Sequence, residues 1–324
     1  AAQIKGAWCG STLLRLTTTE GRIYLKSAYT RPPGEAQLVA ALAARWPDAL
    51  PDVIAHDATR NLLLMRDFGD GMLRYGAQMS RWENAARGFG ALQLACSSHL
   101  DEWLAMGCED RRLPTLMPHF ERLLADTPYL WPGHERGLTE EQTAQVRSLL
   151  PRLAEMAAQL GASGIPDSLV QQDFRHGNLA VVARPESPDS AFRFVYYDWG
   201  DAVVSHPFFS GTRMLDYLGR AFELDVRGPS GLPSRVTYAR GAIHRYLRDA
   251  YVEPWTALAP ARDVRAAFDL ARKLNPLWQT VRWWLEIPYY ETASPWGRDS
   301  LTWGPNHLRR LLREMEEPAR VENR

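Results

Sequence analysis

The segment 171–178, QQDFRHGN, gathers the side chains best suited to chemistry. It holds a carboxylate at Asp173 and, five positions later, a carboxamide at Asn178, just after an apolar dipeptide. A second acidic segment, YYDWGD at 196–201, ends a later apolar run and supplies Asp198. Because loops held by strands commonly present catalytic groups, we expect these oxygen-bearing side chains to meet at one site.

The spacing from Asp173 to Asn178 matches the D-x-x-x-x-N part of a kinase catalytic loop, and Asp198 stands where a D-x-G element has its metal-binding aspartate. Phosphoryl transfer from ATP depends mainly on positioning and charge neutralisation, which gives each residue type a role. Asn178 and Asp198 offer hard oxygen ligands for Mg²⁺. Asp173 would orient an acceptor hydroxyl and take its proton.

The same chemistry requires a lysine on an N-terminal strand and an acidic partner on the next helix. Lys26 lies in the predicted strand RIYLKSA, and Glu35 opens the helical pattern that follows. Only three of the 38 basic residues are lysines, so a lysine at this position has low odds of arising by chance. The pair is predicted to hold an ammonium on the α- and β-phosphates by a charge-assisted hydrogen bond.

Two further segments are assigned to the nucleotide. Residues 62–69, LLLMRDFG, form the predicted hinge between two lobes. The backbone groups expected to read the adenine edge belong to Met65, Arg66 and Asp67. Residues 6–12, GAWCGST, which include Ser11, are the predicted turn over the phosphates, although this turn has only two glycines. The expected cofactors are ATP, with GTP as the alternative, and Mg²⁺.

These side chains need particular elements to position them. Residues 1–70 are predicted to be β-rich, with one hairpin turning at Glu20–Gly21 and a second turning near Thr59 and Arg60. Between the hairpins, apolar residues recur at helical spacing from residue 35 to 46 and predict one amphipathic helix. This arrangement puts Lys26 on a strand and Glu35 at the start of a helix.

From residue 80 the pattern becomes helical. Ser80 with Glu83 and Thr139 with Gln142 are predicted capping boxes, and Pro151 is predicted to kink the helix after the second box. A β-like island at 165–200 interrupts the helices and places the segment QQDFRHGN at its first turn. Helical patterns resume at 211–224, 234–250, 261–274 and 306–316.

The composition excludes several classes of protein. The 324 residues are 45% hydrophobic, enough for two modest cores, and Lys+Arg and Asp+Glu both total 38. Balanced charge argues against a nucleic-acid or membrane partner, and no obligate protein partner is indicated. No apolar run reaches the roughly 18 residues of a membrane span. The three cysteines form no CxxC pair, so we expect a reducing compartment and a cytoplasmic location.

Four segments together resemble one family. They are IYLK, DFRHGN, YYDWGD and the SHPFF that follows. They are similar to the motifs of the aminoglycoside phosphotransferase and choline kinase-like family of small-molecule kinases, and the resemblance covers most of the chain in element order. It implies an α+β, bilobal protein-kinase-like fold. Residues 1–69 would form a small β-rich lobe with one helix, and residues 70–324 a larger, mainly helical lobe carrying a β-hairpin island.

The resemblance also implies roles for single residues. Asp173 would be the catalytic base, Asn178 and Asp198 the magnesium ligands, and Lys26 the lysine that binds phosphate. The chain departs from the family at Gln171, because the family loop usually begins His-Gly-Asp. That histidine is chiefly a packing and hydrogen-bonding support, so its replacement removes no reacting group.

The C-terminal part of the chain is expected to select the acceptor. Residues 278–303 contain a cluster of Trp and Tyr, whose faces stack on sugar rings and on ammonium groups. The candidate acceptor residues are Asp173, Arg175, Asp201, Trp284 and Glu286. The expected acceptor is a small hydroxylated molecule: a sugar, an amino sugar, an aminoglycoside or an amino alcohol. Near balance of charge beyond residue 200 argues against a polycation.

Other interpretations remain open from the sequence. A catalytically inactive, pseudokinase-like protein would bind the nucleotide or small molecule without turnover. A protein kinase is disfavoured, because no Ala-Pro-Glu element follows DWGD, and a metal-dependent hydrolase would not need Lys26. His176 and His206 match no common zinc spacing. Arg175 either contacts substrate or braces its loop, and Asp201 either lines the cleft or is a solvated or capping residue.

Overall fold

The computed structural model describes residues 1–4, 11–28, 34–69, 79–183, 192–216, 236–293 and 303–316. The chain divides into two compact units: Ala1–Asp110 with Pro166–Arg265, and Arg111–Ile165 with Ala266–Arg324. The predicted catalytic and nucleotide-binding residues belong to the first unit, whereas the candidate acceptor residues Trp284 and Glu286 belong to the second. The predicted lobe boundary at residue 69 stays a prediction.

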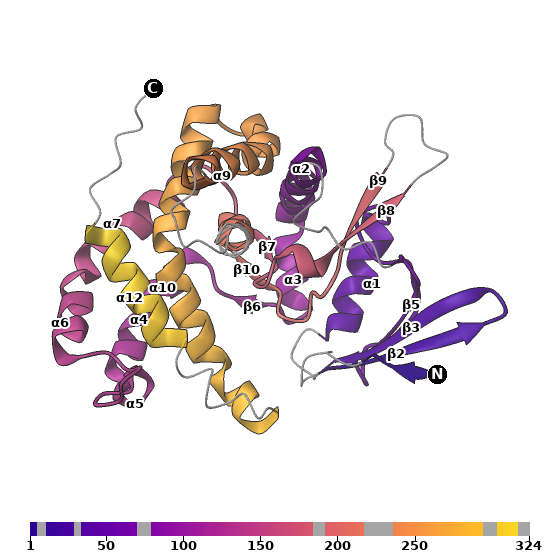
Figure 1. Cartoon of the computed structure of the whole chain (residues 1–324), viewed down its shortest axis with the longest axis horizontal. Coiled ribbons are helices and arrows are strands. Elements are labelled where there is room, and N and C mark those ends of the chain that lie inside the picture. The colour runs from indigo at the N-terminus through magenta and orange to yellow at the C-terminus, as the bar shows by residue number, and fades with distance from the viewer. Residues whose placement is uncertain are drawn as a thin grey trace. The chain divides into compact units, whose positions relative to one another are not determined.

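A five-stranded antiparallel sheet forms the N-terminal part of the first unit (Figure 1). Its strand order is β1 (Ala2–Gln3), β2 (Ser11–Thr18), β3 (Gly21–Ala28), β5 (Leu62–Arg66) and β4 (Val53–Asp57). Both predicted hairpins are confirmed, and Gly21 has the positive φ of 117° that the first turn requires. Lys26 lies on the central strand β3, paired with Leu13 and Leu63.

The predicted helix is α1 (Glu35–Arg45), which packs against β4 and β5 and buries Leu38 and Leu42. Gly34 precedes it and provides no side-chain cap. Instead Asn61, from the turn before β5, accepts a 2.9 Å hydrogen bond from the Ala36 N–H and donates to the Ala28 carbonyl. One buried amide therefore joins the start of α1 to the end of β3.

The rest of the first unit consists of helices, one β-hairpin and a small three-stranded sheet. Its elements are α2 (Met79–Cys96), η1 (Ser97–His99), α3 (Leu100–Ala105), β6 (Glu109–Asp110), β7 (Ser168–Val170), η2 (His176–Asn178), β8 (Leu179–Ala183), β9 (Phe192–Tyr196), β10 (Val203–Ser205), α9 (Val236–Val252) and η3 (Glu253–Ala257). Strands β8 and β9 form the predicted hairpin, whereas β7 pairs with β10 in a sheet of order β6-β10-β7. The Ser80 cap is wrong: Met79 is already helical, and Glu83 pairs with Arg87.

The second unit is helical. It contains α4 (Leu113–Ala125), α5 (Thr127–Leu130), α6 (Glu140–Ser148), α7 (Leu150–Gly161), α12 (Trp303–Glu316) and most of α10 (Ala261–Ala293). The capping box of Thr139 and Gln142 is confirmed at the start of α6. The predicted kink at Pro151 is wrong, because the chain breaks into two helices and Pro151 occupies the first turn of the second, where its missing N–H costs nothing.

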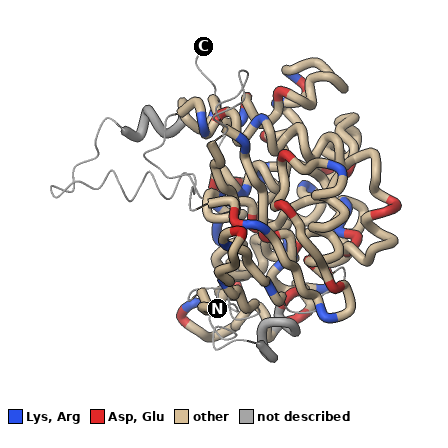
Figure 2. The backbone as a smooth tube through the Cα atoms, turned by 90° about the vertical axis from the view of Figure 1, so that its right-hand side faces the viewer, with Lys and Arg blue, Asp and Glu red and all other residues tan. Residues whose placement is uncertain are grey.

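Figure 2 shows basic and acidic residues interspersed along the described backbone, as the balanced composition predicts. In the described ranges, no helix combines the length and apolar character needed for a membrane span. The mixed α+β class with a small antiparallel N-terminal sheet is confirmed.

His206 is a buried ionisable residue of the first unit. It follows β10, accepts a hydrogen bond from the Phe208 N–H at Nδ1, and contacts the rings of Phe208 and Phe209. Burial lowers its pKa to about 3. The neutral form is therefore the folded form. Among the described residues, no group of three His, Cys, Asp or Glu is placed to hold a metal.

This burial predicts an acid-sensitive stability. Below the ordinary histidine pKa of 6.5, His206 of the unfolded chain is protonated, whereas folded His206 stays neutral down to about pH 3. The free energy of unfolding is therefore highest above pH 6.5 and falls as the pH drops below it. Lowering the pH from 7.5 to 5.0 should remove about 2 kcal/mol through this group. Urea unfolding at both values should show a smaller loss in His206→Asn, which keeps an acceptor near Nδ1. An equal loss in both proteins would contradict the assignment.

Candidate active site

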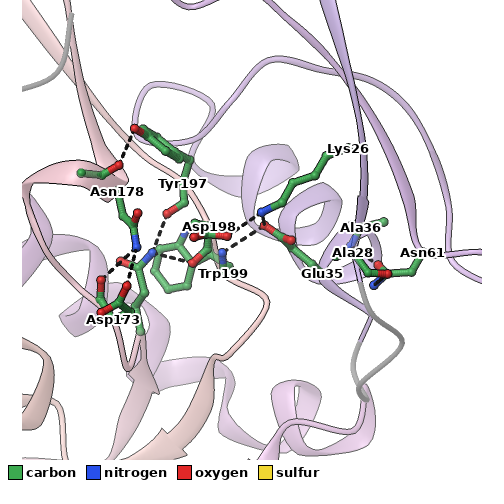
Figure 3. A network of polar contacts seen from close by, with 12 residues as sticks. Lys26, Ala28, Glu35, Ala36, Asn61, Asp173, Asn178, Tyr197, Asp198 and Trp199 are labelled. Carbon is green, nitrogen blue, oxygen red and sulfur yellow. Dashed lines mark hydrogen bonds and ion pairs between the residues drawn. The ribbon is translucent and has the colours of Figure 1, made fainter. Parts of the chain in front are cut away.

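The centre of the site is the ammonium of Lys26, which lies between two carboxylates (Figure 3). Its Nζ is 2.7 Å from Oε1 of Glu35 and 2.5 Å from Oδ1 of Asp198. The Lys26 side chain is 14% exposed, and that of Asp198 is 46% exposed. The predicted lysine–glutamate pair is therefore present, and Asp198, 172 residues away in the chain, joins it.

The charged groups of this cluster shift one another's pKa values. Burial alone would lower the pKa of Lys26, but Glu35 and Asp198 outweigh it and raise that pKa above its ordinary value. Burial raises the pKa of Glu35, and the Lys26 ammonium opposes that rise. Lys26 is therefore charged at neutral pH and can donate three hydrogen bonds.

Glu35 also fixes the turn that carries Asp198. Its Oε1 accepts a 3.2 Å hydrogen bond from the N–H of Trp199. A Cβ at Gly200 would lie 3.3 Å from Oε2 of Glu35, so the glycine leaves the space that the carboxylate occupies. The first residue of α1 thus holds both Lys26 and the DWG turn.

The loop QQDFRHGN is anchored by its aromatic residue. Phe174 is fully buried and stacks on Phe89 of α2, with ring centroids 3.6 Å apart. Asn178 closes the loop, because its Nδ2 donates to the Asp173 carbonyl at 2.9 Å and its N–H donates to the Arg175 carbonyl. These contacts fix Asp173 and Asn178, the two residues of the motif, on one compact turn.

Two guanidiniums contact the carboxylate of Asp173. Nε of Arg175 donates to Oδ2 at 2.8 Å, and Nη2 of Arg213 lies 3.6 Å from Oδ1. Arg213 belongs to the helical residues 208–216, which begin within the SHPFF segment. Arg213 was not predicted as a site residue, because its spacing from Asp173 matches no local motif. Only its place directly after SHPFF could have pointed to it.

Asp198 has an unusual backbone conformation. Its φ is +67°, which costs an L-residue roughly 1–2 kcal/mol, although Asp tolerates it better than most. Gln171 offsets this strain: its Nε2 donates to the Tyr197 carbonyl at 2.6 Å and to the Asp198 carbonyl at 2.9 Å. The residue that departs from the family pattern thus supports the backbone of the predicted metal ligand.

The support behind Gln171 is also polar and buried. Ser210 donates to the Gln171 carbonyl at 2.9 Å, and Gln93 of α2 donates to Ser210 and to the Leu169 carbonyl. The Tyr251 hydroxyl from α9 donates to Gln93 at 2.5 Å. A continuous chain of hydrogen bonds therefore connects α2 and α9 to the turn that presents Asp198.

The structure describes only some of the residues predicted to bind the nucleotide. Residues 6–10 of the predicted phosphate turn lie outside the described residues, and Ser11 begins β2, paired with Ala28. Met65 and Arg66 end β5, and Asp67 follows it. The N–H groups of Arg66 and Asp67 donate to the Asp52 and Arg22 carbonyls. Their role towards adenine stays a prediction.

Asp201 follows the same turn as Asp198. Its carbonyl accepts a 2.6 Å hydrogen bond from Gln172, a fully buried residue of the loop QQDFRHGN. Gln172 thus ties the loop to the end of the turn, much as Gln171 ties it to the beginning. A role for Asp201 towards an acceptor stays a prediction.

The predicted acceptor residues of the second unit are engaged with neighbours. Trp284 donates through Nε1 to Asp126 at 2.7 Å. Glu286 is fully buried, with Arg111 at 3.5 Å and Arg282 at 3.4 Å from its Oε1. Trp278 and Trp283 are buried, so part of the aromatic cluster is core, while the side chains of residues 287–302 lie outside the described residues. Their role as an acceptor site stays a prediction.

Comparison with solved structures identifies the fold. A choline/ethanolamine kinase family protein from Mesorhizobium loti matches with a TM-score of 0.56 and 14% identity over 98% of this chain and 89% of its own. Macrolide 2′-phosphotransferase MphH from Brachybacterium faecium matches with 0.54 and 16%, over 94% and 90%. Choline kinase LicA from Streptococcus pneumoniae matches with 0.54 and 13%, over 97% and 92%.

The sequence itself matches no protein-family model, and no curated protein matches it. The structural likeness therefore establishes the fold: the chain has the protein-kinase-like fold of small-molecule kinases and phosphotransferases, as the sequence predicted. The resemblance inferred from four short segments is confirmed at that level.

The support of Asp198 by Gln171 is testable. Gln171→Met keeps the length of the side chain but leaves two partly buried carbonyls without their donor, which should lower the free energy of unfolding by about 1–3 kcal/mol. It should also weaken binding of magnesium-ATP, because the Asp198 carboxylate loses its fixed direction. Urea unfolding and calorimetric titration measure the two effects.

Gln172→Met is the matched control, since it removes a buried hydrogen bond to Asp201 instead. We expect it to lower stability with little effect on nucleotide affinity. Equal losses of affinity in both variants would show that Gln171 has no special relation to Asp198.

Proposed function

We propose that this protein transfers the γ-phosphate of ATP to a hydroxyl group of a small molecule. One observation carries the proposal: the Lys26 ammonium contacts Glu35 and Asp198 together, and a continuous set of hydrogen bonds links Asp198 to the loop of Asp173 and Asn178. A purely structural ion pair would not need its acidic members beside a D-x-x-x-x-N loop. The fold shared with small-molecule kinases and phosphotransferases supports the same conclusion.

In the proposed reaction Lys26 donates hydrogen bonds to the α- and β-phosphates, held there by Glu35. Asp173 accepts a hydrogen bond from the acceptor hydroxyl and directs its oxygen at the γ-phosphorus. A bond forms between these two atoms, and the bond from the γ-phosphorus to the bridging oxygen breaks. ADP leaves with the electron pair, while the hydroxyl proton passes to Asp173 and then to water. The proton need move only late, so a carboxylate is a sufficient base.

The residues present fit magnesium. Asp198 offers a half-exposed carboxylate and Asn178 an amide oxygen, since Nδ2 of Asn178 is already committed to the Asp173 carbonyl. Both are hard oxygen donors, and Mg²⁺ typically takes one or two protein ligands together with phosphates and water. Bound there, the ion would neutralise charge on the phosphate oxygens.

For the acceptor we propose a class of molecules and not a single compound. The structural neighbours include choline, ethanolamine and aminopropanol kinases and a macrolide phosphotransferase, all of which act on small molecules. We propose a small hydroxylated acceptor for this chain, with ATP as donor and GTP as the alternative. The predicted cytoplasmic location stays a prediction.

Asp173→Asn should lower kcat by about 100-fold or more, because the amide still accepts a hydrogen bond but cannot take the proton. The shift of melting temperature with magnesium-ATP should remain. ADP release with a panel of hydroxylated acceptors measures turnover. Asp263→Asn, a surface carboxylate paired with Arg262, is the control and should retain full activity.

The same measurements separate the kinase from a pseudokinase-like binding protein. A binder would gain stability from nucleotide and release no ADP with any acceptor. An Asp173→Asn variant as active as the parent would also refute the assigned base.

A further inference from the structure

Tyr197 joins the two segments that carry the proposed magnesium ligands. It directly precedes Asp198, and it is hydrogen-bonded to the turn of Asn178 (Figure 3). Its phenol donates a 2.6 Å hydrogen bond to the Gly177 carbonyl, and its N–H donates a 3.1 Å hydrogen bond to the Asn178 carbonyl. These two carbonyls stand on either side of the Asn178 α-carbon. Tyr197 therefore holds the backbone of one proposed ligand from both sides, while it is covalently joined to the other.

The phenol bond depends on tyrosine, whereas the N–H bond does not. Strands β8 and β9 end with Leu179 opposite Tyr196, and the bond from the Tyr197 N–H extends their ladder by one step. Any residue except proline would supply it, because only proline lacks the N–H. The bond to Gly177 needs a donor at the end of a long side chain. A phenylalanine in place of Tyr197 would therefore leave the Gly177 carbonyl without this donor.

The neighbouring Tyr196 has a different role. Successive side chains of a strand point to opposite faces. Tyr196 is fully buried, and its phenol donates a 2.7 Å hydrogen bond to the Ala85 carbonyl of α2. That bond fixes the hairpin to a helix and contacts neither segment with a proposed ligand. Tyr197 is half-buried, and its phenol bonds only to the loop that carries Asn178.

A second contact fixes the direction of the Tyr197 ring. The ring centroid of Phe68 lies 5.3 Å from that of Tyr197, with an interplanar angle of 35°. Phe68 follows Asp67, the last residue of the segment predicted to read adenine. The Tyr197 side chain is thus held at its ring by Phe68 and at its hydroxyl by the Gly177 carbonyl. Turning the phenol away from the loop would break both contacts.

The spacing of two ligands matters most for a small ion. Mg²⁺ requires near-ideal octahedral geometry with oxygen ligands at about 2.0–2.1 Å, whereas Ca²⁺ accepts about 2.3–2.6 Å and less regular arrangements. Asn178 and Asp198 belong to two different segments of the chain. A loose connection between these segments would therefore weaken Mg²⁺ binding more than Ca²⁺ binding.

We propose that Tyr197 is a positioning residue, whose phenol sets the spacing of Asn178 and Asp198 and so makes the site prefer Mg²⁺ to Ca²⁺. This inference rests on the proposed function and extends it to the choice of metal. Tyr197 acts through the backbone of Asn178 and not as a ligand. Gln171 donates to the Tyr197 carbonyl, so the peptide that leads to Asp198 is fixed as well.

The test uses Tyr197→Phe, which keeps the ring and its contact with Phe68 and removes only the hydroxyl. Calorimetric titration with a non-hydrolysable ATP analogue, once in excess Mg²⁺ and once in excess Ca²⁺, gives a ratio of two affinities. That ratio should fall about fivefold in the variant, the order of one neutral hydrogen bond, while affinity in Ca²⁺ changes less than about twofold. The ratio is a binding measurement and does not depend on turnover.

Tyr196→Phe is the matched control, since it removes a phenol bond to a backbone carbonyl from the adjacent residue. Urea unfolding should show a loss of stability in both variants, but the metal ratio of Tyr196→Phe should equal that of the parent. The proposal would be overturned by an unchanged ratio in Tyr197→Phe, by equal losses of affinity in both metals, or by the same fall in Tyr196→Phe.

A double substitution tests the route through Asn178. In Asn178→Ala the ratio should already be lowered, and adding Tyr197→Phe should change it less than about twofold, because the ligand that the phenol positions is gone. A further fivefold fall in the double variant would refute the assignment.

Failure of the proposed function has a separate signature. A parent protein that binds the magnesium complex and releases no ADP with any acceptor would refute the kinase, and the metal ratio would still decide the role of Tyr197. A parent that binds the analogue with neither metal would overturn both.

Discussion

One buried ammonium joins three parts of the chain. Lys26 comes from the centre of β3, Glu35 from the first turn of α1 and Asp198 from the turn after β9. A buried charge without partners is strongly unfavourable, so these contacts must form together. A shift of β3 by one residue would turn Lys26 to the opposite face of the sheet. The register of the sheet, the position of α1 and the site are therefore set by the same interaction.

Two buried side-chain amides make this arrangement possible. Asn61 satisfies the first turn of α1 and the end of β3, and Gln171 satisfies two carbonyls around Asp198. An amide carries both donors and an acceptor without a charge, so it can satisfy backbone groups in a buried place at no cost in ionisation. The histidine expected at position 171 would titrate, whereas a glutamine supports Asp198 equally at every pH.

The parts of the site that were predicted from the sequence are those fixed by local spacing. Asp173 and Asn178 lie within one turn, and a rare lysine on a strand pointed to Lys26. Asn61 and Arg213 escaped prediction because their partners are distant in sequence: Asn61 caps a helix 25 residues before it. Such contacts depend on how elements pack, which spacing does not reveal.

The ion pairs of two candidate acceptor residues bear on the charge of the acceptor. The second unit holds Glu286 between Arg111 and Arg282, and the first unit holds Asp173 between two guanidiniums. Both carboxylates were among the candidate acceptor residues, and Asp173 was also the predicted base. A cationic group would have to displace an arginine from either one, and breaking the buried ion pairs of Glu286 is costly. Recognition of a polycation through these two residues is therefore unfavourable, and a neutral or anionic hydroxylated acceptor requires no such exchange.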